Sequence, residues 1–528
     1  MPRTLRIFLW LGYVLAVALP WTGIPWRAFS IPAGAVVVLL AAGLAVSPEW
    51  RRGFAAAAGS LEACEAGRLA WRAAALFFIW LASLKLCQYA AFQSHYGDLG
   101  QDANICWNTL HGRPFLDSVA GINFLGDHFE PVLALCALGF KVWPSAGALL
   151  LIQSLALALA LVPLAGLARL HARSNAGVLA FAILFALNPF LHMVSEFDFH
   201  PEALFIPAAF WALLLWERRR PWLAGLVVLP CLGIKEDVTL ALAGFGLYAA
   251  WDVGAASPGR RKAGGALFAA GIAAFAVIAL WIIPHFAGSR VSAHHDRYAS
   301  LGLTTAAMIR NVAQHPWIIL LRLLRPRVLL TYGLLLGSAG FLPLAAPVAL
   351  VPVGAACLHH LLSDYHSQYA LVSQYSAQTL PFLFYAALLG WSRGGQSLGR
   401  QRWLPAAFVF LCGLLILFQP QYTRSFQWRN VRQAQRLLGQ VPEGVPVATD
   451  GSHGAGDEDP LAHLALRREL LGLCMSQPFR APQAQYVLLD AQRWQPYARY
   501  LAAVAGFERL GVGDGLELWR QNRSAPPP

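Results

Sequence analysis

Two carboxylates stand four residues apart, directly after a long apolar run of the chain. They are Asp98 and Asp102, in the segment HYGDLGQDANICWNTLHGRPF at 95–115. If 97–110 is helical, both side chains lie on one face, because residues four apart in a helix are neighbours. Two acids on one face suit general-base catalysis or the binding of a divalent cation. The alternative is an interfacial helix whose acids simply face water, which is an ordinary place for ionisable residues.

Two further motifs combine acids and a histidine with a proline. They are GDHFEPVLAL at 126–135, with His128 and Glu130, and SEFDFHPEAL at 195–204, with Asp198, His200 and Glu202. Proline is favoured at a helix start, and acids there face the positive helix end, so Glu130 also has a structural explanation. A histidine beside two acids is suited to binding a metal ion or carrying a proton.

Three consecutive charges, Lys235, Glu236 and Asp237, separate the apolar stretches 222–234 and 238–252. Charges at membrane depth are costly unless they meet partners or a wet cavity. A solvated turn would normally carry Gly, Pro or Asn instead. The triplet therefore indicates more than a surface turn.

Histidines and tyrosines gather in two later segments, SRVSAHHDRYASLG at 289–302 and HHLLSDYHSQYALVSQYSAQ at 359–378. Their polar residues include His294, His295, Asp296, Arg297, His359, His360, Asp364, Tyr365, His366 and Tyr369. Eight of the 15 histidines of the chain fall in these and the preceding motifs or at His285, all on one predicted face of the membrane. This distribution predicts a shared polar chamber.

The elements that position these motifs are set by composition. Of 528 residues, 57% are apolar and 13% charged, and the mean hydropathy is +0.51. Soluble domains carry about 25% charged residues, and a helix of roughly 17–25 apolar residues crosses a bilayer. Runs of this kind occur at 5–22, 31–47, 73–92, 147–168, 176–194, 264–284, 376–392 and 403–419. We therefore predict an all-α polytopic membrane protein with about 11–13 transmembrane or re-entrant helices.

Charge and cysteine content exclude other classes. The net charge of +13 comes from short Arg clusters beside apolar runs, where topology signals belong, so we expect no nucleic-acid partner. The run 5–22 lacks a small-residue cleavage site and is interpreted as a retained helix. The eight cysteines show no metal-type spacing and are expected to be small core residues. P-loop, dinucleotide, nucleophile-elbow and HExxH motifs are missing from the sequence.

The basic clusters mark the cytoplasmic ends of the helices, which places the polar motifs and the tail after about residue 420 on the opposite face. One segment does not fit the alternation of cytoplasmic and external segments along the chain. At about 1.5 Å per residue, 129–143 reaches only about 22 Å, so it is expected to dip into the membrane without crossing. The alternative is that Arg169 and Arg173 lie outside.

The tail at 420–528 differs in pattern from the region 1–419, which contains the external loop 93–128. VPVATD, AQYVLLDA and LELWRQ predict strands, and 459–475 and 495–506 predict helices. We predict a small extracytoplasmic α/β accessory domain. On one interpretation, this domain contacts the acceptor substrate. Its acidic loop suggests a metal site, although such loops are usually only solvated; its residues are Asp450, His453, Asp457, Glu458 and Asp459.

The motifs YGDLGQDANICWNTLHGRPF, GDHFEPVLAL, FDFHPE and KEDV, in this order, resemble the DUF2079 family of bacterial membrane proteins. LLSDYHSQY and YVLLD extend the resemblance to about residue 520. That family is similar to the GT-C glycosyltransferases, which pass a sugar from a polyprenyl-phosphate donor to a lipid, protein or glycan acceptor with inversion. The resemblance implies a GT-C-like fold in the bacterial cytoplasmic (inner) membrane and a role in the cell envelope.

Carried over, the GT-C acidic residue that acts at the acceptor or a metal is Asp98, with Asp102 the next candidate. His128, Glu130 and Pro131 match the start of the following helix in the protein mannosyltransferase and aminoarabinose transferase branches. Those branches often pair two acids in direct succession, whereas Leu99 follows Asp98 here, which leaves the role of Asp102 open.

The resulting hypothesis is that Asp98 is the base and that cationic side chains hold the donor phosphate. Lys235 and Arg297 are the candidates for binding the phosphate. An equal alternative is that Glu236 and Asp237 neutralise the charge of Lys235. The other expected substrate-binding residues are His128, Glu130, Asp198, His200, Glu202 and His366. If a divalent cation is bound, its expected ligands are Asp98, Asp102 and His128.

Two alternatives stay open: a transporter or lipid flippase, and a non-catalytic assembly protein of the same fold. A transporter is expected to place Glu236 and Asp237 near mid-membrane with access from both sides. A transferase is expected to gather Asp98, His128, His200 and Lys235 around one cavity.

Overall fold

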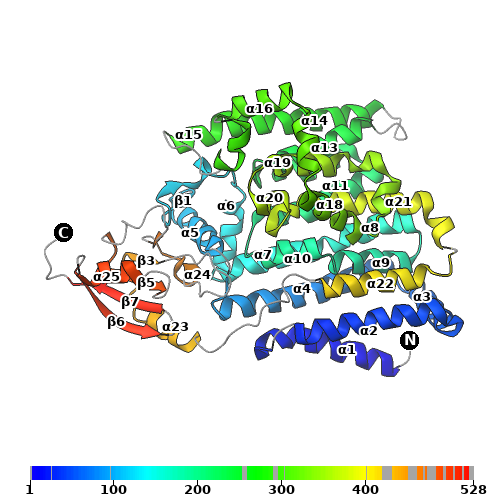
Figure 1. Cartoon of the computed structure of the whole chain (residues 1–528), viewed down its shortest axis with the longest axis horizontal. Coiled ribbons are helices and arrows are strands. Elements are labelled where there is room, and N and C mark those ends of the chain that lie inside the picture. The colour runs from blue at the N-terminus through cyan, green and yellow to red at the C-terminus, as the bar shows by residue number, and fades with distance from the viewer. Residues whose placement is uncertain are drawn as a thin grey trace.

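A computed structural model was obtained for the chain, and it shows a mainly helical protein with a five-stranded sheet near the C-terminus (Figure 1). A short two-stranded ribbon follows α5 and consists of β1 (Leu116–Asp117) and β2 (Ile122–Asn123). The structure describes residues 3–24, 27–94, 97–251, 258–288, 295–302, 304–399, 401–418, 431–449, 461–467, 470–472, 483–490, 495–503, 506–513 and 516–522. The fold class expected from composition is therefore confirmed.

The helical part begins with four helices and continues through short and long elements to residue 417. The first group is α1 (Arg3–Ala18), α2 (Arg27–Val46), α3 (Pro48–Leu61), α4 (Ala66–Ala90), α5 (Asp98–Leu110), α6 (Leu133–Cys136), η3 (Ala137–Lys141), α7 (Gly147–Leu159), α8 (Leu161–Ala172), α9 (Asn175–Ala186) and α10 (Pro189–Glu196). The second group is η4 (Pro201–Leu204), α11 (Phe205–Glu217), α12 (Pro221–Val228), η5 (Leu229–Gly233), α13 (Val238–Trp251), α14 (Pro258–Val277), η7 (Ile278–Ile282) and α15 (Ile283–Ala287). The third group is η8 (His295–Leu301), α16 (Thr305–Gln314), α17 (Trp317–Leu323), α18 (Pro326–Ser338), η9 (Leu342–Ala345), η10 (Pro347–Leu350), α19 (Val351–Leu362), α20 (His366–Tyr369), η11 (Ser373–Ser376), α21 (Leu380–Gly399) and α22 (Leu404–Leu417).

Several of these helices are long and apolar enough to cross a membrane. Among the described residues they are Arg27–Val46, Ala66–Ala90, Gly147–Ala172 and Pro258–Ala287. The pair α9 and α10 is also long and apolar enough when taken together, and it is bent by 47° at the break, as in a broken span or a re-entrant loop. The break coincides with Pro189, whose missing N–H and ring favour a new helix start. Shorter apolar helices of 10–17 residues complete the layer.

The segment 129–143 does not form a crossing helix. It folds into the four-residue α6 and the five-residue η3. At about 1.5–2 Å per residue these two pieces cover only about 16 Å, roughly half of the hydrocarbon core. These two pieces are therefore too short to cross a membrane as a helix.

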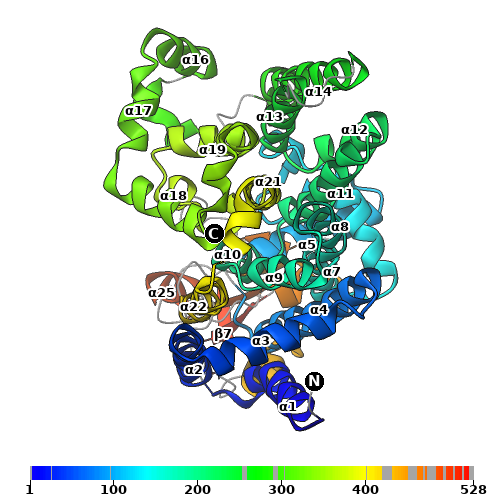
Figure 2. The same ribbon diagram turned by 90° about the vertical axis from the view of Figure 1, so that its right-hand side faces the viewer.

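A large apolar core holds the helical part together. It is built by α4, α7, α8, α11 and α21, with Leu161, Leu213 and Phe384 almost fully buried. Figures 1 and 2 show α13 and α14 side by side. In Figure 2, α16, α17 and α18 lie on the other side of α19 from α11 and α12. This arrangement leaves α14 and α16 to flank the site described below.

Close helix packing at the N-terminal end depends on small residues. A Cβ atom on Gly34 of α2 would lie 2.6 Å from Leu417 Cγ, and one on Gly413 of α22 would lie 2.7 Å from Val38 Cγ2. Small residues allow membrane helices to approach each other closely. The second apolar run, which forms α2, thus packs against α22, the last helix before the tail.

The tail contains a five-stranded mixed sheet in the order β4-β3-β5-β7-β6. Its elements are α23 (Val431–Leu438), β3 (Val447–Thr449), α24 (Leu461–Leu464), β4 (Leu470–Gly472), β5 (Tyr486–Asp490), α25 (Gln495–Ala503), β6 (Phe507–Gly513) and β7 (Leu516–Gln521). β3 pairs in parallel with β4 and β5, and β7 pairs antiparallel with β5 and β6.

The tail predictions are partly right. The three expected strands form as β3, β5 and β7, and the helix expected at 495–506 forms as α25. The helix expected over 459–475 is wrong, because α24 ends at Leu464 and β4 follows. β6 is a further strand, which the sequence patterns above do not predict; it forms by pairing with β7 over Phe507–Gly513.

The tail packs directly on α5. Asn104 Nδ2 donates hydrogen bonds to the carbonyls of Ala465 (2.9 Å) and Arg467 (3.0 Å). A Cβ atom on Gly100 would lie 2.6 Å from Leu461 Cγ, so the glycine permits the contact. Buried residues of α5, α6 and the sheet form one hydrophobic cluster. The tail therefore packs against α5, the helix that begins at Asp98, and stabilises its position.

Candidate functional site

One cavity of about 920 Å³ collects most of the polar motifs. Its polar lining comes from α5, from loops near 127–130, 200 and 235–237, and from η8, α19 and the segment 365–375. The polar residues include Asp98, Gln101, Asp102, Asp127, His128, Glu130, His200, Lys235, Glu236, Asp237, Arg297, His359 and Gln374, with Tyr298, Tyr365 and Tyr375. Its apolar lining comes chiefly from α14 to α16 and includes Phe275, Ala279, Ile283, Met308, Ile309 and Val312. The cavity therefore has one ionic wall and one hydrocarbon wall.

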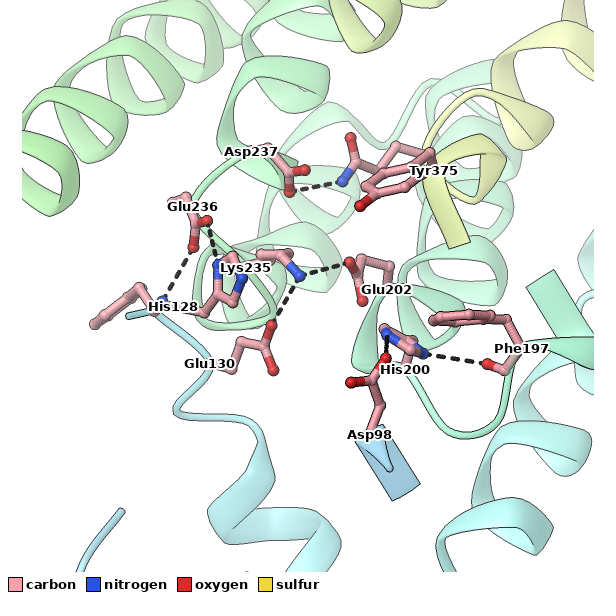
Figure 3. A network of polar contacts seen from close by, with 12 residues as sticks. Asp98, His128, Glu130, Phe197, His200, Glu202, Lys235, Glu236, Asp237 and Tyr375 are labelled. Carbon is pink, nitrogen blue, oxygen red and sulfur yellow. Dashed lines mark hydrogen bonds and ion pairs between the residues drawn. The ribbon is translucent and has the colours of Figure 1, made fainter. Parts of the chain in front are cut away.

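Asp98 stands at the first position of α5. The preceding Gly97 has φ of 77°, which a glycine adopts without strain, and this turn starts the helix. Asp98 and Asp102 both line the cavity, so the helix and the shared face expected from their spacing are present. Asp98 Oδ2 lies 3.7 Å from His200 Nε2, beyond hydrogen-bond distance (Figure 3).

The surroundings shift the pKa values of Asp98 and His200 in opposite directions. Burial, together with the nearby Asp198 carboxylate, raises the pKa of Asp98 to about 7. Burial and the Lys235 ammonium lower the pKa of His200 to about 3, so its ring is neutral. Its Nδ1–H donates to the Phe197 carbonyl at 3.2 Å. Asp98 is thus a carboxyl group that exchanges a proton near neutral pH, beside a fixed neutral imidazole.

Lys235 is clamped between two carboxylates from distant segments. Its Nζ lies 3.0 Å from Glu130 Oε1 and 2.9 Å from Glu202 Oε1 (Figure 3). The loop that carries it is tied to the 129–132 segment, because Val132 N donates to Gly233 O at 2.9 Å. Burial alone would lower the pKa of Lys235, and the surrounding carboxylates together raise it, so the ammonium persists. Its charge is compensated by Glu130 and Glu202 rather than by its sequence neighbours.

Those neighbours have other partners. His128 Nδ1 lies 2.8 Å from Glu236 Oε1, and Glu236 Oε2 accepts a hydrogen bond from Phe129 N at 3.0 Å. This contact raises the pKa of His128 against the opposing effects of burial and Lys235. It lowers the pKa of Glu236 although burial acts the other way. The pair is therefore ionic.

Asp237 faces a different group of residues. Its Oδ2 lies 3.1 Å from His359 Nε2, and its Oδ1 accepts a hydrogen bond from Gln378 Nε2 at 2.7 Å. The three consecutive charges therefore have different partners, and these partners lie on three segments of the chain.

Arg297 supplies a further cation on the same cavity. Its guanidinium lies 4.9 Å from the centre of the Tyr365 ring, and Nη1 donates to Tyr375 Oη at 3.4 Å. Aromatic and hydroxyl contacts position the guanidinium without neutralising it.

The structure brings most expected site residues together, with three exceptions. Glu202 is buried and pairs with Lys235, but it is not one of the lining residues. Asp198 is buried behind the lining, near Asp98, and has φ of 31°. His366 lies in α20 outside the lining residues. His294 and the acidic tail residues Asp450, His453, Asp457, Glu458 and Asp459 lie outside the described residues.

Several lining residues were not among the expected site residues. They are Gln101, Asp127, Tyr298, His359, Tyr365, Gln374 and Tyr375. His359 and Tyr365 belong to the segment HHLLSDYHSQY, which the sequence marks as polar, but spacing does not indicate which residue of such a run turns inward. The expected single cavity for Asp98, His128, His200 and Lys235 is present.

Comparisons with known proteins give three findings. No curated protein matches the chain. The crystal structure of ArnT from Cupriavidus metallidurans bound to undecaprenyl phosphate is similar, with a TM-score of 0.49 and 13% sequence identity, over 86% of this chain and 99% of that chain. The family model DUF2079, described as a predicted membrane protein, matches residues 88–501. Because this match covers most of the chain, the protein belongs to the DUF2079 family of multi-pass membrane proteins.

Proposed function

We propose that this protein is an inverting membrane glycosyltransferase that moves a sugar from a polyprenyl-phosphate donor to an acceptor hydroxyl at the outer face of the cytoplasmic membrane. The observation that carries the proposal is the cavity that Asp98, at the ionic wall, shares with the hydrocarbon wall of α14 to α16. A lipid-linked sugar has both characters, since its chain is apolar and its head is polar.

Asp98 supplies the base. In the reaction the acceptor oxygen attacks the anomeric carbon, its proton passes to the Asp98 carboxylate, and the bond between that carbon and the phosphate oxygen breaks. A base is most effective when its pKa lies near the working pH, and the pKa of Asp98 is raised to about 7. The 3.7 Å separation from His200 leaves the carboxylate free to accept a proton from a substrate hydroxyl.

Arg297 supplies the charge that the departing polyprenyl phosphate needs. Lys235 is held by Glu130 and Glu202, whereas Arg297 meets only aromatic and hydroxyl groups in its described side-chain contacts. A guanidinium presents a planar fork of donors that matches phosphate geometry. We therefore assign the phosphate to Arg297 and a structural role to Lys235.

The test uses cells that lack this protein and are complemented with the wild-type chain or Asp98→Asn. Mass spectrometry of their lipids is expected to show a polyprenyl-phosphate sugar that accumulates without the protein and disappears with the wild type. Loss of a general base costs roughly 10²–10⁴-fold in rate, so Asp98→Asn is expected to leave the lipid accumulated. Glu508→Gln, an exposed acid on β6, is the matched control and is expected to restore turnover.

Restoration by Asp98→Asn at normal expression, or no accumulating lipid at all, would contradict the proposal. Movement of the lipid-linked sugar across vesicle membranes without transfer would indicate a transporter or flippase instead. In proteoliposomes supplied with the accumulated lipid, transfer is expected to rise about tenfold per pH unit up to about pH 7 and then level off, because the base form of Asp98 increases as pH rises through its pKa.

A further inference from the structure

Asp237, His359 and His360 form a cluster that the proposed reaction does not use. Each residue offers one ligand atom, and these atoms lie within 4.8 Å of one another. Among the described residues this is the one group of three such side chains with that geometry. The members come from the loop before α13 and from the end of α19, so only the fold brings them together.

His360 is the informative member. Its side chain is 1% exposed, and neither ring nitrogen meets a hydrogen-bonding partner in the part of the chain that the structure describes. His359 Nδ1 is in the same situation. A buried polar atom without a partner costs about 1–3 kcal/mol, so native proteins rarely keep one without a use. Two adjacent imidazoles with free nitrogens beside a carboxylate provide the donor set that divalent transition metals prefer.

We propose that Asp237, His359 and His360 bind a divalent transition-metal ion of the zinc type. Two imidazole nitrogens and one carboxylate oxygen are a common three-residue set for such an ion. In a tetrahedral site with bonds of about 2.1 Å, ligand atoms lie about 3.4 Å apart. Asp237 Oδ2 and His359 Nε2, at 3.1 Å, already have this spacing. All three ligand atoms lie within 4.8 Å of one another, so a bound ion has to draw the most distant pair closer by roughly 1.4 Å at most.

The surroundings fit this assignment. Gln378 Nε2 donates to the other oxygen of Asp237 at 2.7 Å, and such an outer hydrogen bond orients a carboxylate ligand. Asp237 and His359 line the large cavity. Three protein ligands leave a fourth position open to a further ligand from the cavity that Asp237 and His359 line. If the proposed function holds, this position would bind an anionic oxygen of the substrate; metal binding itself does not depend on that function.

The test uses the full chain in detergent, stripped with a chelator and titrated with Zn²⁺ against a chromophoric competitor. One Zn²⁺ per chain is expected. Gln378→Met, which removes an outer hydrogen bond, is expected to weaken binding by about 10–100-fold. His360→Ala and Asp237→Asn remove ligands and are expected to weaken it further. His315→Gln, a histidine of α16 that contacts Asn311 outside the cavity, is the matched control with unchanged affinity.

Co²⁺ provides a second readout, because its visible absorption reports a four-coordinate site with nitrogen and oxygen ligands. This absorption is expected in the wild type and in His315→Gln, and not in His360→Ala that elutes as a folded monodisperse protein. Absence of stoichiometric Zn²⁺ in the wild type would overturn the proposal, and so would unchanged affinity in His360→Ala. Neither measurement uses transfer activity, so failure here leaves the glycosyltransferase proposal standing.

Discussion

The cluster around Lys235 and the cluster around His360 lie next to the same cavity and differ in how their buried polar atoms are satisfied. Lys235 meets Glu130 and Glu202 at 3.0 and 2.9 Å, and its charge is used within the protein. His360 is equally buried, and its ring nitrogens have no partner among the described residues. Buried charges that are paired hold segments together, whereas buried donors without partners are available to a ligand. The comparison separates structural from ligand-binding groups within one site.

The largest effect is expected from Lys235→Met. This change leaves the Glu130 and Glu202 carboxylates buried without their cation, which typically costs about 3–5 kcal/mol of stability. The loss is expected to shrink as pH falls, because burial raises the pKa of Glu130 and a buried carboxylate without its cation becomes neutral by binding a proton. Unfolding in mixed detergent and SDS micelles at several pH values measures it. A loss below about 1 kcal/mol would show that Lys235 is not a structural cation.

Glu202→Gln is expected to have an intermediate effect. The amide keeps the size of the side chain, and Glu130 still pairs with Lys235, so the loss is that of one charge-assisted hydrogen bond, about 1.5–3 kcal/mol. The same unfolding assay measures it. An effect as large as that of Lys235→Met would mean that the two carboxylates do not share the cation.

The smallest effect is expected from His360→Leu in metal-free protein. Replacing a buried ring without polar partners by an apolar side chain of similar size is expected to change stability by less than about 1 kcal/mol, or to increase it. With Zn²⁺ at 100 times its dissociation constant, the wild type alone is expected to gain about 2.7 kcal/mol. A large loss in the metal-free variant would show that His360 has a structural role.

The sequence predicts the membrane class and most local elements of this protein. Composition and run lengths predict the helical part, and the 15-residue length of 129–143 predicts a piece that is too short to cross. Alternating apolar residues predict β3, β5 and β7. The prediction is wrong at 459–475, because a short apolar run does not distinguish a helix from a strand that gains its partner from elsewhere in the chain.

The site also has features that the sequence predicts and features that only the tertiary structure decides. Spacing alone places Asp98 and Asp102 on one face, since helix geometry is local. The partner of Lys235 is decided by the tertiary structure: Glu236 and Asp237 are nearest in sequence, yet Glu130 and Glu202 hold it.

The amino-acid sequence by itself determined that this protein lies in a membrane, where its apolar helices are and where the polar segments between them are. Hydrophobicity and helix period depend on neighbouring residues, so they can be analysed from the sequence alone. Only the tertiary structure decided which charge meets which. Ion pairs and possible metal ligands join atoms 3–5 Å apart from segments a hundred or more residues apart, as with Asp237 and His359, and such distances are set by packing.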